Sequence, residues 1–303
     1  MKRIIYIALI VGTLAVPMLT QALTVGPVKL EYSVQPGDTV RGEMIVQNEE
    51  NIERTFYPSS ERFIEVNGEK RFSKDENNLS SWFVMQSSIT LKPTEQRVIP
   101  FTINIPSNAD PGGHYAVIWW STASPQESPG KQVSIVTRAG VLVYVRVAGD
   151  IVEDGSVAKF LVNGAHNFFA SVPLELSIHF QNSGNVHLKP TGEFVLKNLF
   201  GSEKAKLAIN PYGLQILPNT SKSLAAEWKA ENSNPFGFYK ISYDAVFGES
   251  EQVAQASRWI FIFSWSPFIW ILIVLLAILF IPALIKKYNR WIIGKSGSSG
   301  LRE

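Results

Sequence analysis

The sequence contains no cysteine among its 303 residues, and it has only four histidines. Without cysteine there is no disulfide, no thiolate zinc site, no iron–sulfur cluster and no thiol nucleophile. A lipoprotein anchor is excluded too, because lipid attachment at a signal-peptide cleavage site needs a cysteine. A metal site formed by His179 and His187 is conceivable, but histidines at surfaces and in turns are common and seldom bind metal. We therefore expect no metal and no cofactor.

Basic charge is scarce in the central part of the chain. Between Leu23 and Ser264 there are 21 Lys and Arg against 25 Asp and Glu. This mildly acidic balance offers no electrostatic footprint for nucleic acid, which we exclude as a partner. The sequence also lacks a Gly-x-Ser-x-Gly elbow and a convergent acid/base constellation, and Gly294-Lys295-Ser296 lacks the first glycine of a phosphate-binding loop. We expect that the protein is not an enzyme.

Long hydrophobic runs occur only at the two ends. Lys2 and Arg3 precede an apolar run of about 13 residues, and small residues at Thr20 and Ala22 fit a cleavage site. This pattern predicts a signal peptide over residues 1–22. The alternative is an uncleaved N-terminal anchor, for which the run falls short of the ~20 residues that span a bilayer.

The C-terminal run, Pro267–Ile285, holds 19 residues without a charge. At about 1.5 Å per residue a helix of this length reaches ~28 Å, close to the hydrocarbon thickness of a bilayer. Lys286, Lys287 and Arg290 follow it. The alternative, a buried core helix, is rarely apolar on every face and followed by a basic cluster. We predict a transmembrane helix over 265–287 that contacts the lipid bilayer, in a single-pass plasma-membrane protein with its N-terminus outside and a basic cytoplasmic tail, 288–303.

Between these ends the sequence is typical of β structure. In Ile99–Ile105 the odd-numbered positions are apolar, and in Val172–Phe180 the even-numbered ones are. Both patterns predict strands with one buried face. We expect an all-β ectodomain of two tandem immunoglobulin-like β-sandwiches, over 23–149 and 150–264, followed by one C-terminal transmembrane helix.

Three short motifs recur in the two halves, which indicates an internal repeat. A Gln-Asn pair ends one strand, a proline marks a turn, and a Gly-x-Tyr motif opens a late strand. A tyrosine there can turn its hydroxyl back to the chain, as in immunoglobulin-like corners, or serve as an ordinary core residue. The pairs are Asn48 and Asn182, Pro93 and Pro218, and Tyr115 and Tyr239.

Four residues are candidates for ligand contact. Trp119 and Trp120 are adjacent in a predicted strand and therefore point to opposite faces. We expect one in the core, while the other packs against a neighbouring element or stacks on a sugar. Asn185 and His187 lie in a polar, turn-rich segment, which is either a binding loop or a plain connection at a sandwich end.

Several motifs resemble the bacterial WxL-protein-interacting surface proteins. They are Val34-Gln35-Pro36-Gly37-Asp38-Thr39-Val40, Leu91-Lys92-Pro93 and Pro111-Gly112-Gly113-His114-Tyr115. The resemblance implies a peptidoglycan-binding, immunoglobulin-like domain and a host-binding domain before a membrane anchor. The segment Asn182–Gly192 also resembles uncharacterised surface proteins of uncultivated bacterial lineages. No ligand residue carries over from either resemblance.

Two functional hypotheses follow. The first is a membrane-anchored surface module for binding or adhesion, which engages a cell-wall polymer such as peptidoglycan or a partner surface protein. The second is a membrane-anchored assembly scaffold or chaperone-like protein that pairs an edge strand with a client. The second requires an unpaired edge that is not protected by lysine or proline.

Overall fold

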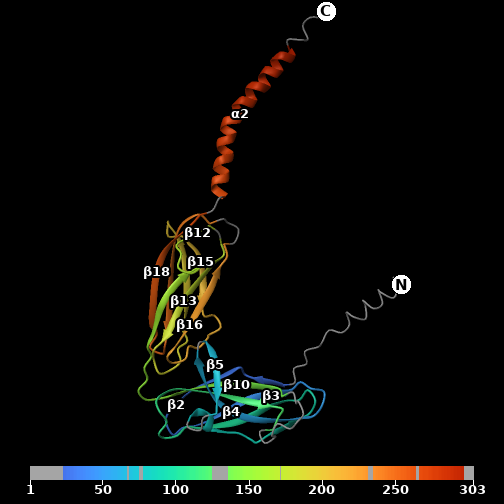
Figure 1. The fold of residues 1–303 in the computed structure, drawn as a ribbon, viewed down its shortest axis with the longest axis vertical. Coiled ribbons are helices and arrows are strands. Elements are labelled where there is room, and N and C mark those ends of the chain that lie inside the picture. The colour runs from blue at the N-terminus through green and yellow to red at the C-terminus, as the bar shows by residue number, and fades with distance from the viewer. Residues whose placement is uncertain are drawn as a thin grey trace, which may run out of the picture. The chain divides into compact units, whose positions relative to one another are not determined.

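The computed structural model consists of β-strands followed by one C-terminal helix (Figure 1). It describes residues 23–66, 68–74, 78–124, 136–170, 172–230, 235–263 and 266–296. The predicted signal peptide therefore lies outside the described residues. The predominance of strands agrees with the all-β expectation.

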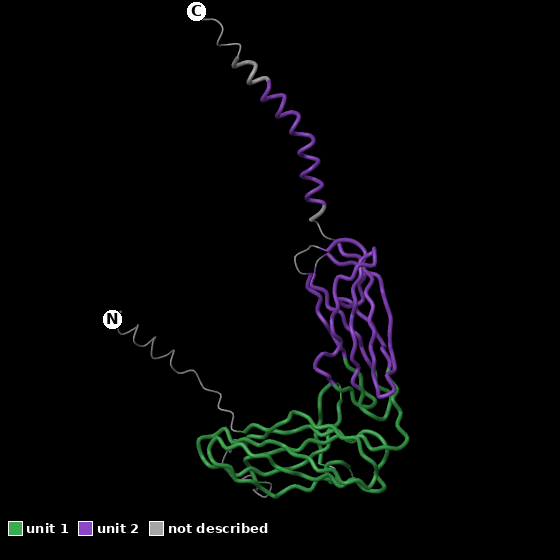
Figure 2. The backbone as a smooth tube through the Cα atoms, turned by 180° about the vertical axis from the view of Figure 1, so that it is seen from behind, with its two compact units in different colours: residues 1–155, 181–188, 215–222 green, residues 156–180, 189–214, 223–303 purple. Residues whose placement is uncertain are grey.

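The chain divides into two compact units (Figure 2). The first comprises residues 1–155 with two short later segments, 181–188 and 215–222. The second comprises 156–180, 189–214 and 223–303. The predicted boundary at 149/150 lies close to the first division, after residue 155. The prediction did not include the two later segments that belong to the first unit.

The first unit contains two β-sheets that share one core. In the four-stranded sheet, every neighbouring pair is antiparallel. Its order is β1 (Leu23–Gly26), β3 (Thr39–Asn48), β8 (Gln96–Asn104) and β6 (Phe83–Val84).

The second sheet of this unit has six strands, and it begins with a parallel pair, β2 and β10. A short 3₁₀ helix, η1 (Leu79–Ser81), precedes β6 of the other sheet. The order is β2 (Lys29–Val34), β10 (Arg138–Val147), β9 (Gly112–Ser121), β4 (Arg54–Val66) and β5 (Glu69–Ser73), with β7 (Ile89–Leu91) paired to the start of β4.

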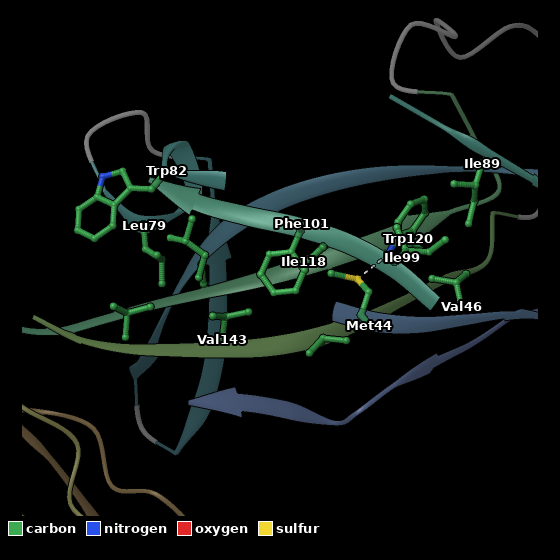
Figure 3. Close-up of a cluster of buried hydrophobic side chains, with 14 of the residues drawn as sticks. Met44, Val46, Leu79, Trp82, Ile89, Ile99, Phe101, Ile118, Trp120 and Val143 are labelled. Atoms are coloured by element: carbon green, nitrogen blue, oxygen red, sulfur yellow. Dashed lines mark hydrogen bonds between the residues drawn. The ribbon is translucent and has the colours of Figure 1, made fainter. Parts of the chain in front are cut away.

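The core between these sheets is built from alternating positions on the facing strands (Figure 3). On β8 the buried positions are Ile99, Phe101 and Ile103, as the odd-position pattern predicts. Met44 on β3 faces Trp120 on β9, and the indole Nε1 donates to the Met44 sulfur at 3.0 Å. This contact joins the two sheets at the centre of the core.

The second unit repeats this plan with fewer strands. Phe180 from one sheet meets Phe247 from the other, with ring centroids 4.9 Å apart. The three-stranded sheet has the order β11 (Gly155–Val162), β13 (Leu174–Asn182) and β16 (Thr220–Trp228). The five-stranded sheet has the order β12 (Phe168–Phe169), β18 (Gln252–Ile262), β17 (Gly237–Phe247), β14 (Thr191–Asn198) and β15 (Glu203–Ile209).

The sheet orders of the two units correspond strand by strand. The order β1-β3-β8 matches β11-β13-β16, and β2-β10-β9-β4-β5 matches β12-β18-β17-β14-β15. In each unit the first pair of the larger sheet is parallel. The internal repeat in the sequence is therefore matched by a repeat in topology. Two differences remain, because no described strand of the second unit matches β6 or β7.

The repeated asparagine forms the same buried contact in the smaller sheet of each repeat. Asn48 ends β3 and donates from Nδ2 to the carbonyls of Leu91 and Lys92 at 3.2 and 3.0 Å. Asn182 ends β13 and donates to the Ile216 carbonyl at 2.8 Å. Both asparagines are fully buried. Each therefore links the end of one strand to the chain that enters the next strand of the same sheet.

Helix α2 (Ser266–Ser296) follows β18 after a short connection. It contains a segment, Phe268–Asn289, that is long and apolar enough to cross a membrane. The helix runs on past residue 287, where the transmembrane segment was predicted to end. No proline or glycine interrupts residues 288–293, so the sequence holds no helix breaker there.

Strand β5 is not evident from the sequence. Glu69–Ser73 has the polar character of a loop, yet it pairs with the end of β4. Its side chains are all exposed, which explains why the sequence looks like a loop. The strand is held by backbone pairing rather than by a buried face.

Replacing either buried asparagine should destabilise the protein strongly. We expect Asn48→Ala or Asn182→Ala to lower the free energy of unfolding by about 2–4 kcal/mol, because several buried carbonyls lose their donor. Asn48→Asp should be no better, since a carboxylate cannot donate. Denaturant unfolding of the purified chain measures this.

The neighbouring glutamines provide controls. Gln47→Ala and Gln181→Ala should change the free energy of unfolding by no more than about 0.5 kcal/mol, since both side chains are partly or fully exposed. Asparagine variants as stable as these controls would show that the buried contacts do not hold the strand ends.

A candidate functional site at the open edge of β16

Strand β16 lies at the edge of its sheet. Its inner neighbour is β13, and no described strand pairs with its outer edge. The strand reads Thr-Ser-Lys-Ser-Leu-Ala-Ala-Glu-Trp, so it contains one lysine and no proline. An unpaired row of backbone N–H and C=O groups is a template for another strand.

The matching strand in the first unit is protected. There β6 pairs with β8 through Phe83–Val84, opposite Ile103 and Thr102. Pro100 lies further along β8 and has no N–H to offer an incoming strand. The two units thus differ in how this edge is treated: β8 is partly covered and carries a proline, while β16 has neither protection among the described strands.

A groove of about 860 Å³ lies beside this edge. One wall is the end of β16, and the other is β15, the edge strand of the opposite sheet. Trp228 and Tyr239 contribute aromatic surface, with ring centroids 5.7 Å apart. Burial raises the pKa of Tyr239, so its phenol stays neutral at physiological pH.

The rim of the groove is mainly basic. Lys204 and Lys206 come from β15, and Lys229 follows β16. Lys206 lies 3.5 Å from Glu193, and Lys229 lies 3.0 Å from Glu227. Lys204 has no ion pair with any residue in the described ranges. The groove therefore combines an apolar base, a free backbone edge and a positively charged rim.

Strand β16 is one of several open edges in this unit, since β11 and β15 also lie at sheet edges. The outer edge of β18 is largely open as well. It pairs with β12 only at Phe261 and Ile262, which leaves the stretch before them without a described strand partner on that side. Arg258 in this strand donates to the carbonyls of Phe160 and His166. The arginine thus ties this part of β18 to β11 and to the segment that follows β11. Of the open edges, only β16 and β15 line the groove described above.

Trp119 and Trp120 point to opposite faces of their sheet, as expected for adjacent residues in a strand. Trp120 is fully buried in the core, so its side chain has no surface for a ligand. Trp119 lies on the other face, where the Arg138 guanidinium is 4.1 Å from its ring centroid and the Phe72 ring is 5.1 Å away. Its Nε1 donates to Glu61. The indole ring thus packs against Arg138 and Phe72 of the same chain, as expected if it packs against neighbouring elements.

Asn185 acts within the chain. Its Oδ1 accepts from the Val152 N–H and its Nδ2 donates to the Asp150 carbonyl, both at 2.8 Å. Its own carbonyl accepts from the Gly113 N–H at 2.8 Å. These bonds occupy the amide that was expected to contact a ligand, and they tie the segment after β10 to the start of β9.

His187 packs into an aromatic cluster. Its ring lies 5.7 Å from Tyr115 and 5.2 Å from Tyr144. Burial lowers the pKa of His187 to about 4, and burial raises the pKa of Tyr144 to about 12. All three side chains are therefore uncharged at neutral pH. Their burial is typical of packing rather than of ligand binding.

Tyr115 and Tyr239 each occupy the third or fourth position of a late strand, as the repeated motif predicts. Tyr115 belongs to the His187 cluster, and its pKa is raised by burial. Within the described ranges, no group of three or more His, Cys, Asp or Glu could hold a metal ion.

The edge of β16 was missed at the sequence level, although a signal was present. From the repeated asparagine to the turn proline there are 45 residues in the first half and 36 in the second. The longer stretch contains β6, which covers β8. The shorter spacing therefore marks the half in which the covering strand has no counterpart.

No protein-family model and no curated protein matches the chain. Solved structures that align with it include the class 5 fimbriae chaperone CfaA, with 13% identity and a TM-score of 0.41 over 78% of this chain and 98% of that one. The Pseudomonas aeruginosa CupB2 chaperone aligns at 8% identity and a TM-score of 0.34, over 78% and 100%. A Porphyromonas gingivalis protein of unknown function aligns at 14% and 0.30, over 80% and 99%. At these values the alignments carry no conclusion about function.

The half-buried His187 predicts an acid-dependent loss of stability. Its pKa of about 4 in the folded protein lies below the value of about 6.5 in an unfolded chain, so the unfolded chain binds the proton first. The stability due to neutral His187 is complete above pH ~6.5, and it falls by up to about 3 kcal/mol as the pH drops to ~4. His187→Gln should remove this part of the pH dependence.

Unfolding free energies between about pH 7.5 and about pH 4 measure this effect, because this range runs from about one unit above the unfolded pKa down to the folded pKa. His179→Gln provides a histidine control in the same strand region and should keep the wild-type slope. If His187→Gln retained the full acid-dependent loss, the buried neutral imidazole would not be its source.

Proposed function

We propose that this protein is a membrane-anchored assembly scaffold or chaperone-like protein, which pairs the open edge of β16 with an extended segment of a client protein. In this proposal two tandem immunoglobulin-like sandwiches lie outside the plasma membrane and have no enzymatic role. The observation that carries it is the unpaired edge of β16 beside the groove lined by Trp228 and Tyr239.

Edge pairing supplies affinity through the backbone and specificity through alternate side chains. A client strand along β16 would satisfy its free N–H and C=O groups. Every second client side chain would then face the groove, whose aromatic lining includes Trp228 and Tyr239. Acidic side chains nearby would meet Lys204, which has no ion pair with a described residue. The fitting client is thus an extended, apolar segment flanked by acidic residues.

The proposed orientation rests on helix α2. Its uncharged run, Pro267–Ile285, is followed by Lys286 and Lys287, and basic residues favour the cytoplasmic side of a membrane. The two units would then lie on the outer side, consistent with a signal peptide at residues 1–22. Anchoring would keep the binding edge close to the membrane surface, where exported clients emerge.

Binding of cell-wall polymer or of a folded surface protein is the competing proposal. It follows from the resemblance to WxL-protein-interacting proteins, which implies peptidoglycan binding. The residues first expected to contact such a ligand give it less support, because Trp120 is buried and the Asn185 amide is occupied. A binding face for a polymer would have to use other residues.

Two proline variants test the strand-pairing proposal. Successive N–H groups of a strand point to opposite sides, so of Ala225 and Ala226 one N–H faces β13 and the other faces the open edge. Proline at the inward position should destabilise the sheet. Proline at the outward position should leave the unfolding free energy nearly unchanged, yet abolish client capture.

Capture is measured with a photo-crosslinking residue at Ser223 in the full chain in native membranes, with the same residue at Ala256 in β18 as the control edge. The crosslinked client site should map to an extended apolar segment. Capture that survives the stable proline variant, or binding of purified cell wall without any crosslink at Ser223, would contradict strand pairing at β16.

A further inference from the structure

Exposed phenylalanines gather at one end of the second unit. Among the described residues before α2, five phenylalanines are exposed, and four of them belong to this unit: Phe168, Phe200, Phe236 and Phe238. Phe200 has 90% of its surface exposed. Exposed aromatic side chains grouped in this way on a soluble surface mark an interaction site.

Three of the aromatic side chains form a row across neighbouring strands. Phe168 of β12 is paired in register with Phe261 of β18, and Phe261 is paired with Phe238 of β17. The ring centroids are 6.2 and 4.8 Å apart. The row lies on the outer face of the sheet, because the alternate residues Phe169, Tyr239, Ile260 and Ile262 are the buried ones. The outer face of an antiparallel sheet is normally polar.

The turn between β14 and β15 adds two more apolar side chains at the same end. Asn198, the last residue of β14, is in register with Tyr239 near the start of β17. Leu199 and Phe200 follow in the turn, and both are exposed. This end of the sheet is also where β18 finishes, since Gly237 is paired with Ile262.

Helix α2 begins beside these side chains. The Phe268 ring lies 5.9 Å from Phe236 and 5.2 Å from Phe263. Strand β12 is paired with Phe261 and Ile262, the last residues of β18 before α2. The exposed aromatic surface is therefore continuous with the segment that is apolar enough to cross a membrane. We call the group Phe168, Phe200, Phe236, Phe238 and Phe261 the aromatic end.

We propose that the aromatic end inserts into the interface of the lipid bilayer that α2 crosses. Aromatic side chains favour the headgroup region of a bilayer, and the continuity with α2 identifies lipid as the occupant. Trp259 and Lys240 are paired in register on the same outer face, and both are exposed. The indole and the ammonium group are suited to the headgroup layer above the phenylalanines.

This inference goes beyond client binding and rests on the proposed anchorage by α2. Insertion of the aromatic end would attach the second unit to the membrane surface at a second point, in addition to the transmembrane helix. Helix α2 then supplies anchorage, and the aromatic end restrains the orientation of the unit. The groove beside β16 would consequently be held at a defined height above the lipid.

The absence of cysteine allows a direct test with single-cysteine variants of the full chain. Phe200→Cys and Tyr212→Cys are a matched pair, because the two residues are 90% and 91% exposed. They lie beyond opposite ends of β15. Ile278→Cys reports on the middle of α2. Each variant carries an environment-sensitive fluorophore, in phosphatidylethanolamine–phosphatidylglycerol nanodiscs with one copy per disc.

Nitroxide-labelled lipids then act as the quencher. We expect strong loss of emission at positions 278 and 200 and little loss at 212. A label at Phe168→Cys should be quenched as well. Adding Phe200→Ser to this variant should weaken the quenching, whereas adding Tyr212→Ser should leave it unchanged. Quenching at 278 with equal, weak quenching at 200 and 212 would overturn the aromatic-end proposal and leave the anchorage standing. Absence of quenching at 278 would overturn both.

Discussion

The buried amide of Asn48, with its counterpart Asn182, is the contact on which the repeated framework depends. Each asparagine ends a central strand of the smaller sheet and donates to carbonyls that lie just before the turn into the next strand. A buried carbonyl without a donor costs more than a typical hydrogen bond supplies. The amide therefore fixes where β8 and β16 begin, and with that the residues they turn toward the core.

Because the framework is the same in both units, the different treatment of the strands β8 and β16 can be compared directly. In the first unit β6 pairs with part of β8, and Pro100 removes one donor from the strand. In the second unit β16 has no described strand on its outer side. Natural sheets usually protect such edges. An unprotected edge beside an apolar groove is consistent with a surface kept free for a partner strand, and the proposed function follows from this.

Much of the fold could be predicted from the sequence, because alternation at Ile99–Ile105 and the repeated motifs directly reflect buried faces and strand ends. The apolar run after Pro267 likewise predicted helix α2. Strand β5 was missed because all its side chains are exposed, so alternation gives no signal. The candidate site was missed for a similar reason: an open edge is a property of backbone pairing. The roles of Asn185 and His187 depend on neighbours far away in sequence, such as Val152 and Tyr144.

Hydrogen exchange along β16 in the membrane-inserted full chain tests the central claim most directly. A strand bonded on one side only should alternate, with the N–H groups that face β13 protected and those between them exchanging fast. In strand β8 the N–H groups near Thr102 and Ile103 should be protected without alternation, because β6 pairs with the strand there. The account predicts alternating protection over Ser221–Glu227 in the absence of a client. Continuous protection across those residues would mean that the edge is already occupied, and would contradict it.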